Sequence, residues 1–531
     1  MKALTPFILL ALAAPAFAQT PPPQSELEQL LAARPVINQT LTSEEAVTIA
    51  LRESPVVRGA SQEVEIAQAR IEAARAEQRP AAVLSGFLTG GDSPSNVLPP
   101  IIGVPRQVVR VPEGGFLGGK LTAILPLYTG GRLQTLVRQA RALQGASEAE
   151  LESQRQEIAL LTRTAFREVQ ARRALVAVQR DRLIANEEQL RLDRVRADEG
   201  KIPPFFVLRQ EAEVAAAQQE LTNAERDVEL ALLQLKTVMG IGLESNLIIE
   251  GDLEYVPSAE LIARLSGATA TTTAPPIAVP NATVPDANTI APEVAAPNTG
   301  SSVPTATPNR EATAPPAPFP STGADVPNPQ IPTSTPTILA PDLSALLRVA
   351  QRTRPELRAA GARVTGAQLE SGAIGASYKP QLNAFAMGDF GASGGNRNAG
   401  TTFGLVASIP VFTGGRRKAS LQIADARRRQ LESEREQLAL EIAQSVQAAY
   451  LNLNAAERNV GTAQVALTSA REDYRVAQIR YQSGRSTIVD VLDALASRTR
   501  AQSNVVQALF AYNVARDTLL RAVGELAPIN G

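Results

Sequence analysis

The stretch Pro410-Val411-Phe412-Thr413-Gly414-Gly415-Arg416 repeats a pattern that the chain has already used at Pro126-Leu127-Tyr128-Thr129-Gly130-Gly131-Arg132. The two copies lie 284 positions apart, and the same offset joins Gly200-Lys201 to Gly484-Arg485 and Gly240 to Gly524. Upstream of these stretches the offset is 300, so the first copy holds 16 additional residues between Pro80 and Pro126. The chain is therefore a tandem duplication, and an internal repeat of this length fixes the architecture.

The composition and the first residues narrow down the possible partners and the cellular location of the chain. The 52 basic and 53 acidic residues nearly cancel, which gives no reason to expect nucleic acid or an acidic surface as a partner. Lys2, an apolar run and Ala16-Phe17-Ala18 form a predicted secretory signal peptide over residues 1–18. An uncleaved anchor is the alternative, but the run is too short to span a bilayer. The absence of Cys removes disulfides and a lipid-anchoring cysteine.

Proline divides the chain into its predicted parts. Residues 19–256 form the first repeat and residues 341–531 the second. Between them, residues 257–340 are rich in Pro, Ala, Thr and Ser, and such a segment cannot bury enough apolar surface to offset the entropy of ordering. We expect a disordered insert, with a Pro-rich recognition site as the alternative.

Long helices are predicted where proline is missing. Residues 131–199 would form a helix about 100 Å long at 1.5 Å per residue, followed by a returning helix over 203–239. A helix over 43–78 is expected to have Ser43 as its N-cap and a kink at Pro55. The second copy carries two interlocked heptad rows typical of a coiled coil. They are Val446, Leu453, Val460, Leu467, Tyr474 and Tyr481, and Ile442, Ala449, Ala456, Ala463, Ala470 and Ala477. The equivalent second row of the first copy has changed to Arg172, Gln179 and Asn186.

Strand patterns precede each long helix. Residues 81–91 and 115–128 are rich in Gly, Leu, Val and Phe, and residues 402–411 alternate apolar with small or polar side chains. Alternation over about ten positions is typical of a strand with one face toward lipid and one toward a lumen. A soluble hairpin is the alternative interpretation.

At this point the chain resembles the TolC-type outer-membrane efflux proteins. The most specific stretch is Tyr481-Gln482-Ser483-Gly484-Arg485-Ser486-Thr487-Ile488-Val489-Asp490-Val491-Leu492-Asp493-Ala494, which is similar to the periplasmic tip of that family. The resemblance implies a mainly α homotrimer in the outer membrane of a Gram-negative bacterium. Each chain would give four strands to a twelve-stranded transmembrane β-barrel, and its helices would form a long coiled-coil α-barrel across the periplasm. A periplasmic adaptor (membrane fusion) protein and an inner-membrane pump or ABC transporter would dock at the tip.

The resemblance also assigns residues at the tip. Asp490 and Asp493 are three apart on one helix face, so three converging chains would place six carboxylates around one pore constriction. Alternatively, these acids only face the positive end of their helix dipole. Residues expected to close the tip or to dock the adaptor are Tyr481, Gly484, Arg485, Ser486, Gly200, Lys201 and Phe206. TolC itself carries an Arg where Ser486 stands and an Asp where Phe206 stands, which puts the usual closing contacts in doubt.

No catalytic, metal or cofactor-binding residue is predicted. Without His or Cys, and without a phosphate-binding glycine loop, the sequence offers no nucleophile with an activating base, so an enzyme is not expected. The expected function is a passive exit duct of a tripartite efflux or type I secretion system. A periplasmic coiled-coil adaptor or scaffold is the alternative, although an adaptor should show one hairpin rather than two.

Overall fold

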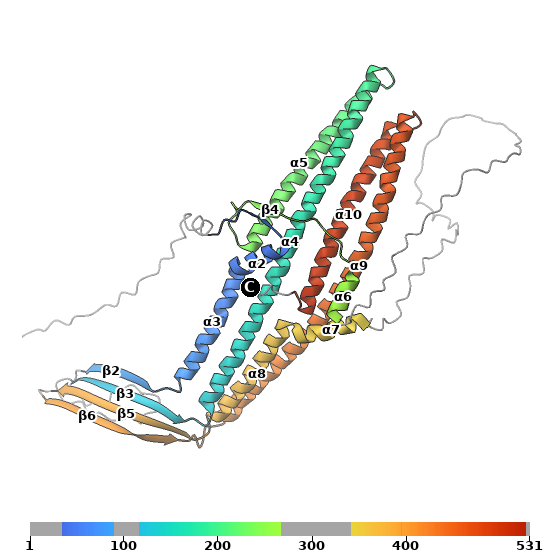
Figure 1. Cartoon of the computed structure of the whole chain (residues 1–531). Helices are drawn as coiled ribbons and strands as arrows, with labels where there is room; N and C mark the ends of the chain where they lie inside the picture. The colour runs from blue at the N-terminus through green and yellow to red at the C-terminus, as the bar shows by residue number, and fades with distance from the viewer. Residues whose placement is uncertain (1–33, 90–115, 267–340, 394–395, 527–531) are drawn as a thin grey trace, which may run out of the picture.

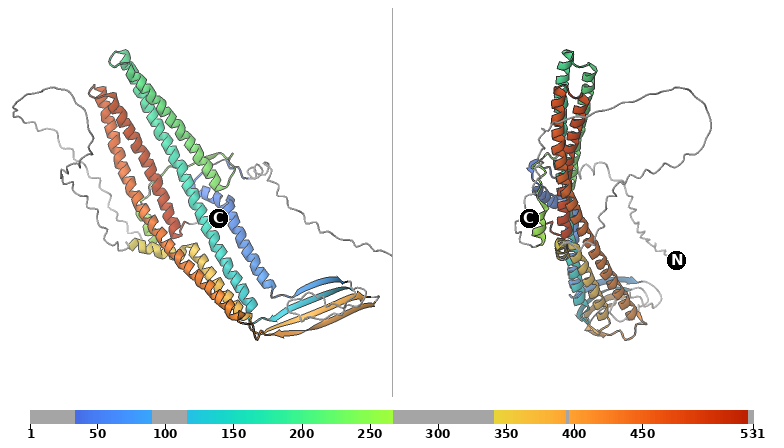
Figure 2. Two further views of the ribbon diagram at one scale, coloured as in Figure 1. Left: turned by 180° about the vertical axis from the view of Figure 1, so that it is seen from behind. Right: turned by 90° about the vertical axis from the view of Figure 1, so that its right-hand side faces the viewer.

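The computed structural model describes residues 34–89, 116–266, 341–393 and 396–526. The molecule is elongated, with a sheet at one end and the turns of two helical hairpins at the other (Figure 1). Seen edge-on, the helices form a thin layer (Figure 2). The signal peptide predicted for residues 1–18 lies outside the described residues, as do residues 267–340 of the Pro-rich insert.

Two long helices confirm the duplication. The helices α4 (Arg132–Asp198) and α9 (Arg416–Gln482) each have 67 residues, and they begin 284 positions apart. Each turns back into a shorter helix, α5 (Phe205–Met239) or α10 (Ile488–Val523), to form an antiparallel hairpin. Both short helices end at a glycine with positive φ, Gly240 or Gly524, a conformation that lets the chain leave the helix without steric cost.

The heptad rows of α9 face its neighbours. Nine of the twelve row residues are buried, and Ala463, Leu467 and Tyr481 are partly exposed. In the first copy Val169, Leu183 and Leu190 are buried on the equivalent row, but so is the polar Asn186. On the second row of the first copy Asn186 is therefore internal, whereas Arg172 and Gln179 are partly exposed.

Proline divides the helices that lead into the sheet. In the first copy α2 (Ser43–Glu53) and α3 (Pro55–Ala76) are separate helices, as are α7 (Pro341–Thr353) and α8 (Pro355–Ala376) in the second. Proline lacks an N–H, so it begins a helix readily and cannot continue one. The kink expected at Pro55 is thus a complete break. The predicted cap Ser43 is also wrong, because Thr42 and Glu45 form a capping box one residue earlier.

A four-stranded antiparallel sheet joins the two copies. Its strands are β2 (Ala81–Thr89), β3 (Phe116–Tyr128), β5 (Gln381–Ser393) and β6 (Asn396–Ser408), in the order β2-β3-β5-β6. The central pair β3–β5 crosses between the copies, with Ile124 opposite Phe385. The strand expected over 402–411 instead begins at Asn396 and stops before Pro410, which cannot donate to a ladder. No helix among the described residues combines the length and the apolar character needed to cross a membrane.

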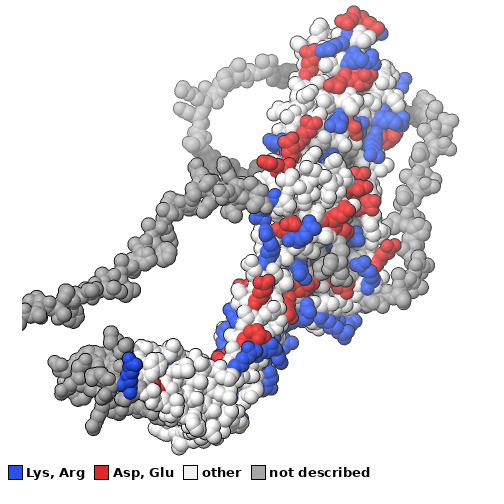
Figure 3. Space-filling view, turned by 60° about the vertical axis from the view of Figure 1, so that its left-hand side comes forward, with Lys and Arg blue, Asp and Glu red and all other residues white. Residues whose placement is uncertain are grey.

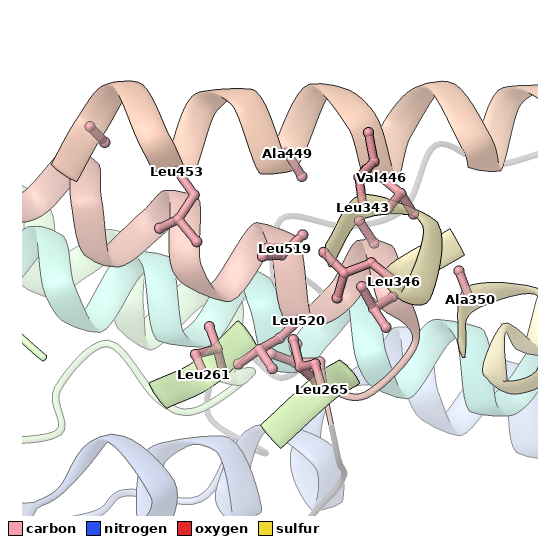
Figure 4. Close-up of a cluster of buried hydrophobic side chains, with 14 of the residues drawn as sticks. Leu261, Leu265, Leu343, Leu346, Ala350, Val446, Ala449, Leu453, Leu519 and Leu520 are labelled. Atoms are coloured by element: carbon pink, nitrogen blue, oxygen red, sulfur yellow. The ribbon is translucent and has the colours of Figure 1, made fainter. Parts of the chain in front are cut away.

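The sequence did not predict a short two-stranded sheet and a short helix that lie beside the middle of the long helices. Strands β1 (Gln39–Leu41) and β4 (Leu247–Ile249) pair in parallel, and helix α6 (Ser258–Ser266) packs against α7 and α9. Leu261 and Leu265 of α6 are buried in the cluster shown in Figure 4, together with residues of α7, α9 and α10. The insert predicted from residue 257 is therefore wrong at its start, because residues 258–266 bury an apolar helix face.

This packing predicts different results for two deletions. Replacing residues 267–340 by a short Gly-Ser linker should leave the thermal midpoint of the purified protein within a few degrees of the parent, because α6 and α7 keep their contacts. Extending the deletion to residues 258–340 removes Leu261 and Leu265, each worth about 2–5 kcal/mol when a buried Leu is lost, and should lower the midpoint clearly. Equal midpoints for the two deletions would show that α6 contributes nothing to stability.

Candidate functional site

The candidate site comprises the two hairpin turns at the end of the molecule away from the sheet. Gly200 and Gly484 both have positive φ, 68° and 71°. In each turn the residue after the glycine donates its N–H to a carbonyl five residues back, Lys201 to Arg196 and Arg485 to Arg480, both at 2.8 Å. This is the Schellman arrangement, which satisfies the last carbonyls of a helix. The two turns form separate tips (Figure 1).

The start of α10 places the predicted acidic pair. Thr487 caps the helix, and its N–H and hydroxyl both donate to Asp490 Oδ2, at 2.8 and 3.0 Å. Asp490 thus serves its own helix within one chain. Asp493 is exposed, and its carboxylate forms no hydrogen bond or ion pair with another described residue. Thr487, and not Ser486, is the N-cap of α10.

Tyr481 connects the two hairpins. Its hydroxyl donates to Asp193 Oδ1 of α4 at 2.7 Å, and Arg196 lies 4.4 Å above its ring. Asp193 is fully buried and also accepts a hydrogen bond from Gln189 at 2.8 Å. Burial raises the pKa of Asp193, although the hydrogen bonds from Tyr481 and Gln189 and the charge of Arg196 oppose that shift. Burial, followed by the hydrogen bond to Asp193, raises the pKa of Tyr481 to about 12.

Sequence reasoning missed Asp193, although a signal was present. The polar row Arg172, Gln179 and Asn186 continues seven residues later at Asp193, where the second copy has Ala477. A carboxylate on a buried heptad row needs a partner, because an unpaired buried charge is costly. The row alone could not name Tyr481 as that partner.

The remaining predicted residues have different surroundings. Phe206 packs against an apolar cluster of the second hairpin, which we call the tip cluster. The buried members of the tip cluster are Tyr474, Ala477, Ile488, Val491, Ala494 and Leu495. Lys201 pairs with Glu199 at 2.6 Å, and Arg485 is exposed. The hydroxyl oxygen of Ser486 is buried without a hydrogen-bond partner among the described residues.

A groove of about 620 Å³ lies next to the tip cluster, between the first hairpin and the second. Its walls carry charged and amide side chains, including Asp181, Glu188, Arg471, Arg475 and Gln502. Arg498 lies 4.3 Å above the ring of Tyr474 at this groove. Among the described residues no group of three or more acidic side chains is arranged to hold a metal ion.

Comparison with known proteins places this architecture. The sequence pattern described as "Outer membrane efflux protein" matches residues 46–241 and 346–525. A stretch of 118 residues is 31% identical to the outer membrane efflux protein BepC of Brucella suis, over 22% of this chain and 25% of BepC. Another of 123 residues is 26% identical to TolC of Escherichia coli, over 23% of this chain and 25% of TolC. The chain thus spans a quarter of the length of these two relatives.

Solved structures agree on the fold. The open-state crystal structure of the MtrE outer membrane channel of Neisseria gonorrhoeae is similar with a TM-score of 0.61 and 18% sequence identity. The likeness covers 91% of this chain and 88% of that chain. Because the family pattern covers both repeats and most of the sequence, the chain belongs to the outer membrane efflux protein family, whose members are channels and not enzymes, and it is a protein of the Gram-negative outer membrane.

Proposed function

We propose that three copies of the chain form an outer-membrane exit duct. The observation that carries this proposal is the four-stranded sheet, whose outer strands β2 and β6 have no further partner among the described residues. Within a bilayer an open edge is too costly, and a closed barrel removes it. Pairing β6 of one protomer with β2 of the next would close a barrel of twelve strands.

The shapes of the sheet and of the helical layer both suit one part of the wall of a hollow duct. Phe403 and Leu405 of β6 are 85% and 65% exposed, so this strand presents large apolar side chains outward. The helices form a thin layer (Figure 2), as expected for one third of a hollow tube. Within this duct substrates would move passively, driven by an inner-membrane pump or by the ABC transporter of a type I secretion system. A periplasmic adaptor would dock at the two hairpin turns, around Gly200 and Gly484.

Disulfide trapping tests the trimer. The chain has no native Cys, so Val83→Cys on β2 can be combined in turn with single cysteines at positions 398 to 406 of β6. We expect covalent trimers for one register, because a disulfide forms only when Cα atoms approach to about 4.4–6.8 Å. The same β6 cysteines paired with Leu121→Cys on the interior strand β3 serve as the control. A soluble periplasmic monomer, or links from β3 as readily as from β2, contradicts the proposal.

We place the pore constriction at Asp490 and Asp493. Because three tips converge in the proposed trimer, their carboxylates crowd together and attract multivalent cations. Asp493 is the sharper probe, since Asp490 is engaged in the cap of α10. The alternative is that both acids only face the positive end of their helix dipole.

Single-channel recording separates these two roles. A trivalent cation added on the periplasmic side should block the parent, and Asp493→Asn should weaken that block by roughly tenfold or more, because three charges leave one constriction. Asp490→Ala should weaken it too, with a cap loss of about 1 kcal/mol. The matched control is Asp473→Asn, an exposed acid on α9. Equal block in the parent and in Asp493→Asn would withdraw the pore assignment.

We further propose that Tyr481 and Asp193 hold the tip closed. Tyr481→Phe removes one of the two hydrogen bonds that Asp193 Oδ1 accepts, and a hydrogen bond to a charged group contributes about 1.5–3 kcal/mol. Hydrogen exchange of residues 186–197 and 474–483 should lose protection by roughly tenfold in this variant. Tyr450→Phe is the control, since the Tyr450 hydroxyl has no hydrogen-bond partner among the described residues. Equal protection in Tyr481→Phe and the parent would exclude this role of the Tyr481–Asp193 hydrogen bond.

The stability of the tip around Tyr481 and Asp193 is also expected to depend on pH. The native pKa of Asp193 is raised, so the folded tip binds a proton more readily than the unfolded chain. The resulting stability is present below the ordinary Asp pKa and is lost as pH rises through the raised value. Asp193→Asn keeps an acceptor for Tyr481 and should remove this pH dependence.

A further inference from the structure

The four junctions between helices and strands lie together at one end of the sheet. In order across the sheet they are α3 to β2, β3 to α4, α8 to β5, and β6 to α9. Arg132 contacts Glu77 at 3.8 Å, and a Cβ at Gly130 would lie 2.6 Å from Cβ of Lys379. The guanidinium of Arg417 lies 5.6 Å from the ring of Tyr378. These contacts connect neighbouring junctions into one continuous surface.

This surface is strongly basic. Segments 76–81, 125–135, 376–382 and 408–419 contain six basic residues and one acidic residue, Glu77. We call the six the basic collar: Arg79, Arg132, Lys379, Arg416, Arg417 and Lys418. Five of them are exposed, and Arg132 is partly exposed. Only Arg132 has an ion pair with a described residue, so the collar keeps an excess of positive charge.

Helix stability does not explain the collar. Positive side chains are unfavourable near a helix N-terminus, where the dipole is already positive. Yet Arg416, Arg417 and Lys418 open α9, Arg132 opens α4, and neither helix has an acid in its first turn. The first acid of α9 is Asp425. The cations are therefore placed against the preference of their own helices, which points to an external anion.

An apolar and aromatic zone adjoins the collar on the side of the sheet. Val411 and Phe412 are 89% and 90% exposed, and Tyr128 is 53% exposed. Figure 3 shows the sheet almost without charge, blue side chains gathered where the helices meet it, and both charges mixed along the helices beyond. A membrane protein typically has apolar residues in the hydrocarbon layer, aromatic residues at the headgroups, and Lys and Arg next to the water. The sheet, the aromatic zone and the collar follow this order.

We propose that the basic collar binds the phosphate groups of acidic glycerophospholipids in the leaflet on the helical side of the outer membrane. This proposal rests on the proposed function, in which the sheet crosses that membrane. Arginine donates in a fork that fits phosphate oxygens, and the stems of Arg and Lys lie along apolar surface while their charged ends reach the headgroups. Clusters of exposed cations beside a bilayer are attracted to acidic lipids. Three copies in the trimer would surround the duct with such sites.

Lipid competition on the purified full-length trimer tests the collar. We would offer phosphatidylglycerol and phosphatidylcholine with identical acyl chains in equal amounts and measure the bound lipid by native mass spectrometry. The parent should retain phosphatidylglycerol in preference, and the triple variant Arg416→Gln, Arg417→Gln, Lys418→Gln should lose this preference by roughly tenfold or more. Added salt should weaken it in the parent.

Matched variants separate the collar from net charge. Arg427→Gln, Arg429→Gln and Arg435→Gln remove the same charge from exposed positions on α9, starting about 16 Å farther along the helix, beyond a Debye length of about 8–10 Å. This control should keep the parental preference. A second variant, Arg79→Gln with Lys379→Gln, leaves α9 untouched and should lose part of it.

Three results would contradict lipid binding by the basic collar. They are an equal preference for phosphatidylglycerol in the triple variant and the parent, an equal loss of that preference in the control, and stronger collar-dependent binding of lipid A than of phosphatidylglycerol. Channel conductance and membrane fractionation are recorded for every variant. A conducting outer-membrane trimer without lipid preference refutes the collar alone, whereas a parent that does not reach the outer membrane refutes the proposed function.

Discussion

Buried charge pairs between the two repeats set the register on which the rest of the structure depends. Arg167 of α4 donates to Asp517 of α10 at 2.7 Å and to Asn513 at 3.0 Å. Nearer the sheet, Arg521 of α10 lies 3.5 Å from Glu157 of α4. Arg521 also donates to Glu356 of α8 within its own repeat at 2.6 Å, and Ser153 of α4 donates to the same carboxylate at 2.7 Å. Burial alone would raise the pKa of Glu356, but the hydrogen bond and charge of Arg521 outweigh it and lower the pKa. Removing one partner of a buried pair costs several kcal/mol, so these pairs favour one axial alignment of α4 against α8 and α10. That alignment lets β3 meet β5 at one end and Tyr481 meet Asp193 at the other.

The two copies share a backbone and differ in chemistry. Ala470 and Ala494 of the second hairpin are buried, and the first hairpin has Asn186 and Gln210 at the equivalent positions. The Gln210 side-chain amide donates to the main-chain carbonyl of Asn186 at 3.0 Å. Likewise Asp193 takes the position of Ala477. A methyl row permits close packing anywhere along its length, whereas a satisfied polar pair fits one position. The duplication therefore supplies the length of the molecule, and the polar substitutions in one copy supply its specific contacts.

The sequence predicted those features that depend on local patterns sustained over many residues. The long helices, their glycine turns and two strand pairs follow from periodicity and from the spacing of proline and glycine. The pairing of β1 with β4 did not, because three-residue strands about 200 positions apart carry no pattern of their own. Helix α6 was hidden at the edge of a proline-rich stretch, where nine residues are too few to outweigh the composition. Asp193 stood on a visible polar row, but its partner Tyr481 lies 288 residues away and is brought near only by the packing of two hairpins.

Net charge was the least informative property of the sequence, and the fold explains why. The formal charge of −1 averages a molecule whose charges are separated along its length. Six basic residues meet one acid where the helices join the sheet, while acids and bases mix along the helices beyond (Figure 3). Electrostatic attraction decays within about a Debye length, so an anion near one end responds to the local excess and not to the total. The expectation that no acidic surface would be a partner followed from the total, and the local charge at the junctions is the reason to set it aside.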